Sequence, residues 1–133
     1  MKALWLDNTL IQGPYVALVI NEKQFNAAMR HCSIPRAERG NWIANEHSSA
    51  TVHTLEKPDG KMCCIVALRV QKGIGPNSIV GLLVHEAVHV WQRFVERIGE
   101  DHPSKEFEAY SIQSISQTLI QAYSDLTKKR AKK

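Results

Sequence analysis

The sequence predicts a small α+β domain with the element order β-α-β-β-α-α, in which a small antiparallel sheet lies beside a buried helix. Two observations support this fold class. Short β-branched runs bounded by Gly and Pro fill the first half of the chain, and two long segments with helical apolar spacing fill the second half. The 133 residues, 44% of them hydrophobic, match one globular domain and exclude both a separate cofactor domain and a disordered chain.

The first predicted elements are a strand and a helix. Residues 15–20 are β-branched and aromatic and follow a Gly-Pro pair, which is typical of a strand. Asn21 is a favourable N-cap for a helix over residues 22–31. Residues 35–45 mix Pro, Arg and Gly, and we expect a loop there.

A hairpin is predicted next. Residues 50–57 and 61–70 are strand-like and flank Pro58, Asp59 and Gly60, a turn sequence that favours an antiparallel pair.

A long helix follows the breaker cluster at residues 71–76. Asn77 or Ser78 can cap this helix, and Gly99 ends it. Its residues are apolar nearly all round, so we expect a central and buried helix. A last helix over about residues 104–126 completes the domain, which we place at residues 1–127.

The net charge of +4 comes from the end of the chain. Five of the 17 basic residues fall within residues 128–133, which we expect to form a flexible basic tail. The rest of the chain is close to neutral, so a nucleic-acid partner is not expected. Binding of nucleic acid through the tail remains an open alternative.

Three cysteines indicate a reducing compartment. Cys63 and Cys64 are neighbours on a predicted strand and therefore point to opposite faces, so they are poorly placed to pair with each other. The sequence shows neither a signal peptide at its start nor an apolar run of membrane-spanning length. We expect a cytoplasmic protein without a membrane partner.

The pattern His85-Glu86-x-x-His89 on the long helix carries the predicted chemistry. Two histidines four residues apart lie about 40° apart around a helix and about 6 Å along it, so both imidazoles can reach one ion. Zinc suits these ligands, and an adjacent glutamate can act as the general base for a zinc-activated water. The alternative is a pair of hydrogen-bonded core histidines.

A zinc site of this kind needs a third ligand. Glu96 lies roughly 10 Å beyond His89 along the same helix, out of reach. Gln92 and Val95 stand where a metzincin has Gly and His, which excludes that class. The remaining candidates follow the long helix: Asp101, His102, Glu106 and Glu108.

Apolar spacing on the last helix favours Glu108. Its stripe consists of Ile112, Ile115, Leu119, Ala122 and Leu126. Extended back by one turn, the stripe reaches Glu108, whereas Glu106 lies on a mostly polar face. A carboxylate on an inward face is explained by a metal. The alternative is a surface glutamate that the helix dipole favours near the N-terminus.

His85, Glu86 and His89, followed after eighteen residues by Glu108, resemble the zinc-site pattern of gluzincins, the metallopeptidases typified by thermolysin. The chain is also similar to small metallopeptidases encoded by phages and prophages. The resemblance implies a minimal zincin-like domain with zinc on His85, His89 and Glu108, and with Glu86 as the base. The chain departs from the family at Phe107, where an Asn is usual.

From this pattern we expect a zinc-dependent metallopeptidase that hydrolyses peptide bonds, with Zn²⁺ as its cofactor and Glu86 as general base. Its peptide or protein substrate would lie along an edge of the hairpin at residues 50–70. The alternative is a catalytically weak or inactive binding or assembly protein that the metal stabilises.

Overall fold

The computed structural model describes residue 3 and residues 13–128. Its elements, in chain order, are β1 (Tyr15–Val19), α1 (Glu22–His31), the short 3-10 helix η1 (Arg36–Glu38), β2 (Ala50–Glu56), β3 (Met62–Leu68), α2 (Pro76–Ile98) and α3 (Lys105–Thr127). The α+β class and the predicted order of strands and α-helices are confirmed. Of the predicted basic tail, Lys128 is described, while residues 129–133 lie outside the described part.

The sheet has three strands in the order β1-β3-β2. β2 and β3 form the antiparallel hairpin that the Pro-Asp-Gly turn predicts. β1 pairs with β3 in parallel, so the sheet is mixed rather than wholly antiparallel. Since α1 and β2 both intervene between the two parallel strands, no local turn signal reveals this pairing.

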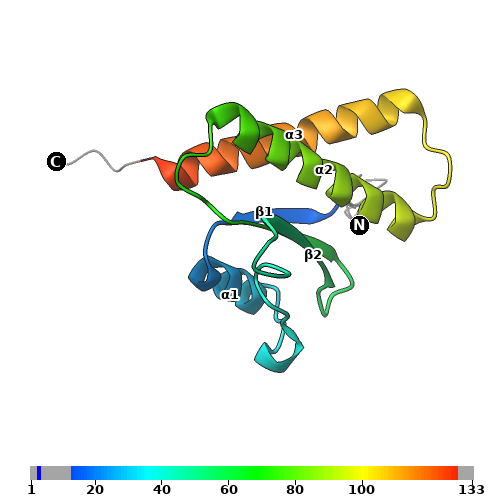
Figure 1. The fold of residues 1–133 in the computed structure, drawn as a ribbon. Helices are drawn as coiled ribbons and strands as arrows, with labels where there is room; N and C mark the ends of the chain where they lie inside the picture. Colours follow the sequence, from blue (N-terminus) through cyan, green and yellow to red (C-terminus); the bar gives the residue numbers. More distant parts are fainter. Residues whose placement is uncertain (1–2, 4–12, 129–133) are drawn as a thin grey trace.

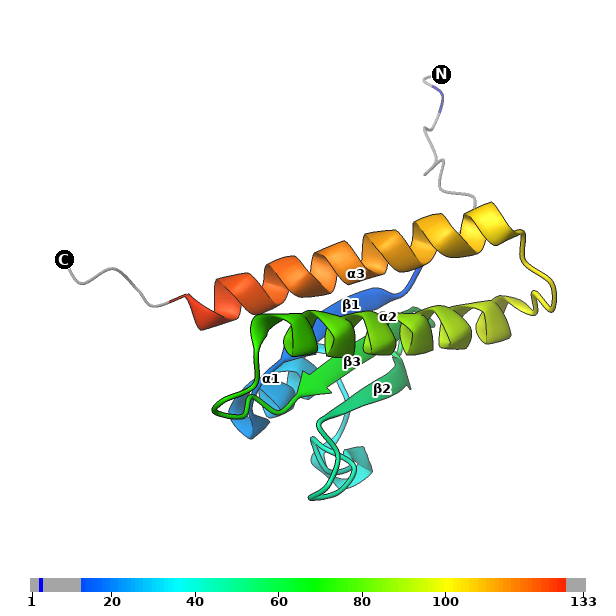
Figure 2. The ribbon, with the colours of Figure 1, turned by 45° about the horizontal axis from the view of Figure 1, so that its top comes forward.

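The sheet lies between two helical layers. α1 covers one face, and α2 and α3 lie side by side over the other (Figures 1 and 2). Every residue of β3 is buried, because this central strand is covered on both faces. Its side chains alternate: Cys64 and Val66 pack with the helix pair, while Ile65 and Ala67 pack with α1.

Local sequence signals set the helix ends. Asn21 Oδ1 accepts a backbone N–H at 2.8 Å at the start of α1, as predicted. Ser104 Oγ does the same for α3 at 3.2 Å. α2 begins slightly earlier than predicted, with Pro76 at its first position, where the missing N–H costs nothing. Gly99 ends α2 in the left-handed conformation, with φ 71°.

Burial covers one side of α2 only, although its apolar sequence predicts burial nearly all round. The buried residues are Ile79, Leu83, Glu86, Ala87, Val90, Trp91 and Phe94. At the edge of this side and towards the helix ends, Val80, Val84 and Ile98 are exposed by 40%, 37% and 41%. Among the described residues, no helix combines the length and the hydrophobicity that crossing a membrane requires.

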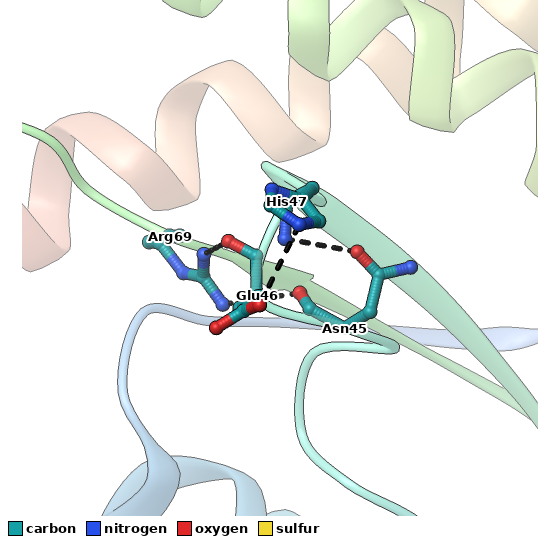
Figure 3. A network of polar contacts seen from close by, with 4 residues as sticks. All are labelled: Asn45, Glu46, His47 and Arg69. Atoms are coloured by element: carbon teal, nitrogen blue, oxygen red, sulfur yellow. Dashed lines mark hydrogen bonds and ion pairs between the residues drawn. The ribbon is translucent and has the colours of Figure 1, made fainter.

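The connection before β2 is tied to the end of β3 (Figure 3). The guanidinium of Arg69 donates to the backbone oxygens of Asn45 and Glu46. Asn45 Oδ1 accepts from the backbone N–H of His47 at 2.9 Å. These bonds satisfy carbonyl groups in a stretch without regular structure, and they hold the start of β2 in register with β3.

We predict that Leu83→Ala lowers the free energy of unfolding by about 2–5 kcal/mol, because Leu83 is fully buried between α2 and the sheet. The neighbouring Val84→Ala is the matched control and should lower it by about 1 kcal/mol or less, since Val84 is 37% exposed and Leu83 is fully buried. Urea unfolding of both variants checks this. Equal losses would contradict the described orientation of α2.

Candidate functional site

The two histidines of the motif converge on the exposed side of α2. His85 and His89 lie one helical turn apart, and their Nε2 atoms are 3.2 Å apart. Their rings meet edge to face, with centroids 4.8 Å apart. Two ligand nitrogens of a tetrahedral zinc ion stand roughly 3.3 Å apart, given Zn–N bonds of about 2.0 Å. The convergence of the two imidazoles is as predicted, and their separation is that of a hydrogen bond between the rings as well as that of two ligands of one metal ion.

Gln92 fixes the orientation of one of these rings. His89 Nδ1 lies 3.0 Å from Gln92 Oε1, one turn further along α2. An amide oxygen only accepts, so Nδ1 carries the proton and the Nε2 of neutral His89 keeps its lone pair. A partner of this kind is typical of metal-binding histidines. Sequence reasoning missed this role for Gln92, although its spacing of three residues from His89 was a usable signal.

Glu86 is the buried member of the motif, with 6% of its surface exposed. Desolvation raises the pKa of its carboxyl group above the usual range, while the nearby His85 and His89 oppose this shift. Among the described residues, no side chain forms a hydrogen bond or an ion pair with this carboxylate. A carboxyl group with a raised pKa, next to two imidazoles, is suited to accept a proton and return it.

Glu108 lies away from the histidines. Its Oε2 accepts a hydrogen bond of 3.0 Å from Trp91 Nε1. Trp91 is two residues beyond His89 and hence about 200° further around α2. The ring of Phe107 meets Trp91 edge to face, at 5.0 Å between centroids, beside the same contact. The stripe on α3 predicts an inward-facing Glu108, but the residue is exposed in the first turn of α3, as in the alternative of a surface glutamate near the helix N-terminus. Its contact with α2 is on a different side from His85.

Among the described residues, no three His, Cys, Asp or Glu side chains are grouped so that they could hold a metal ion. The predicted set of His85, His89 and Glu108 is therefore not assembled, and neither Asp101, His102 nor Glu106 takes the third place. This finding overturns the resemblance to gluzincins, the zincin-like description of the domain and the similarity to small phage and prophage metallopeptidases.

Comparisons with protein-family models, curated proteins and solved structures find no match for this chain.

A groove of about 470 Å³ lies between β2 and the second half of α2. Its lining includes Val52, Thr54, Glu56, Arg93, Glu96 and Arg97. The two arginines are paired, Arg93 with Glu96 at 3.3 Å and Arg97 with Glu56 at 3.8 Å. Arg93 is one turn beyond His89 on α2, but the residues that line the groove do not include His85, Glu86 or His89.

We predict that Glu108→Ala leaves zinc binding unchanged, because Glu108 lies apart from the histidines. It should lower the free energy of unfolding by about 1 kcal/mol, through loss of the hydrogen bond from Trp91. Zinc titration by calorimetry and urea unfolding measure the two effects.

The matched control for this prediction is Glu106→Ala, on the same turn of α3. It should change the free energy of unfolding by less than about 0.5 kcal/mol. A clear loss of zinc affinity in Glu108→Ala alone would return Glu108 to the metal site.

Proposed function

We propose that this protein is a zinc-dependent hydrolase of peptide bonds, in which His85 and His89 bind the metal and Glu86 is the general base. The observation that carries the proposal is the 3.2 Å separation of the two Nε2 atoms, with Glu86 buried next to them. Its ligand set differs from the one that the sequence predicted, since Glu108 is not part of it.

The donor atoms fit zinc in type and spacing. Imidazole nitrogen is a preferred zinc ligand, and both rings are exposed on α2, where water can complete the coordination. The contact between Gln92 and His89 supports metal binding further, because it leaves Nε2 free of a proton.

The edge of the sheet supports a peptide substrate. β2 is an outer strand of the three, and within the described part of the chain it pairs with β3 alone. Its second edge can therefore receive an extended peptide by backbone hydrogen bonds. The groove between β2 and the second half of α2 borders this strand, and Arg93 in its lining is one helical turn beyond His89.

The mechanism follows from the positions of the side chains. Bound zinc would supply polarisation of the scissile carbonyl and acidification of a water molecule. Glu86 accepts the proton from the attacking water and delivers it to the leaving amine nitrogen. Burial favours this role, because it raises the pKa of the carboxyl group above its usual range. A carboxylate with a raised pKa takes up a proton more readily and can then pass it on.

A second candidate is a binding or assembly protein that a metal stabilises without turnover. The observation that favours it is the ligand count, because only two candidate ligands converge in the described residues. Catalytic zinc sites usually have three protein ligands.

We predict that Glu86→Gln keeps the zinc content of the wild-type protein and loses about 10²–10⁴-fold in peptide hydrolysis, because glutamine cannot take up the proton. His85→Ala and His89→Ala should each lose zinc as well as activity. The measurements are metal analysis of untagged protein after zinc dialysis, and cleavage of a fluorescently labelled unfolded protein.

His47→Ala is the matched control, since His47 is exposed on a loop and lies outside the motif. It should behave as wild type in both measurements. Zinc binding without hydrolysis in the wild type would favour the second candidate. Zinc binding that survives both histidine substitutions, or its absence in the wild type, would reject the site.

A further inference from the structure

The three free cysteines are divided between the two faces of the sheet. Cys64 packs in the core between β3 and the helix pair. Cys63, its neighbour, faces α1, whose last turn is followed directly by Cys32. Cys32 and Cys63 therefore meet on the same side of the sheet although they are far apart in the sequence.

The two cysteines are neighbours. Cys32 lies close enough to Cys63 to raise the pKa of its thiol, and both residues line one cavity. Both side chains are almost buried, with 6% and 3% of their surfaces exposed. They line a cavity of about 470 Å³ between α1 and the sheet, together with Tyr15, Ala28, His31 and Lys57; Cys64, whose side chain packs on the opposite face of β3, also borders it. A small solute in this cavity reaches both sulfur atoms.

The surroundings keep this pair reduced until an oxidant arrives. Burial raises the pKa of the Cys63 thiol to about 11, and the neighbouring Cys32 adds to this effect. The ammonium group of Lys57 acts in the opposite direction and stabilises a thiolate in the same cavity. The net effect favours the thiol form of Cys63, and Lys57 offsets part of it, so the cavity combines two neighbouring thiols with a nearby cation.

We propose that Cys32 and Cys63 form an oxidisable dithiol that a small hydroperoxide, such as hydrogen peroxide, converts into an intramolecular disulfide. One thiolate attacks the peroxide, the O–O bond breaks, and a sulfenic acid and hydroxide form. The second thiol attacks this sulfur, the S–S bond forms, and the sulfenic oxygen leaves as water. In sum, two thiols and one peroxide give one disulfide and two waters.

The disulfide would connect the end of α1 to the central strand. It closes the segment between Cys32 and Cys63, which contains η1 and β2. Closing this loop restricts the unfolded chain, so the oxidised protein should unfold at a higher temperature than the reduced one. Because β2 borders the groove between the sheet and α2, the bond also anchors that side of the groove.

The test is oxidation of the reduced, metal-free native protein with hydrogen peroxide in the presence of a chelator. After alkylation under denaturing conditions, intact mass spectrometry should show a monomer with one alkylated cysteine instead of three. Its polypeptide mass, without the alkyl group, should be lower by two hydrogen atoms than that of the reduced chain. Peptide mapping should give a Cys32–Cys63 bond, and thermal unfolding should shift upwards. Thiol reduction should reverse both changes.

Cys64→Ser is the matched control, because Cys64 lies on the opposite face of β3. It should form the same disulfide as the wild type, whereas Cys32→Ser and Cys63→Ser should not form an internal bond. Three unmodified thiols in the treated wild type, a bond that involves Cys64, or oxygen addition without a bond would each overturn the proposal. These outcomes do not depend on zinc or on peptide hydrolysis.

Discussion

Central strand β3 is covered on both faces, and this constraint decides where the other elements lie. Every residue from Met62 to Leu68 is buried, so each face of the strand needs a partner layer. α1 supplies one layer, and α2 with α3 supplies the other (Figure 2). The alternation of side chains along β3 then separates Cys63 from Cys64 and brings Cys63 to Cys32.

The same arrangement gives α2 three different sides. One side packs on the sheet through residues such as Leu83 and Val90. A second side meets α3, where Trp91 donates to Glu108. The third side faces solvent and carries His85 and His89. The motif thus lies where the solvent-facing side of α2 meets its buried side. The histidines are exposed to solvent, whereas burial of Glu86 raises the pKa of its carboxyl group.

Local features of the structure follow from short stretches of sequence. The N-cap at Asn21, the end of α2 at Gly99 and the hairpin turn depend on a few neighbouring residues, and the sequence predicts them. The N-cap at Ser104 is equally local, whereas α2 starts after Gly75 and not at the predicted Asn77 or Ser78. The spacing of His85 and His89 is local in the same sense, because one helical turn fixes it. Gln92 belongs to this group as well, since it reaches His89 from the next turn.

The sequence by itself determined the α+β class, the order of elements and the convergence of two imidazoles on one side of a helix, because backbone periodicity sets each of these within a single element. Only the tertiary structure decided that β1 joins β3 in parallel, that Glu108 meets Trp91 instead of the histidines, and that Cys32 lies close to Cys63. An apolar stripe indicates which side of a helix packs inwards. It does not indicate which side of the neighbouring helix the stripe will contact, because that depends on how all the layers pack together.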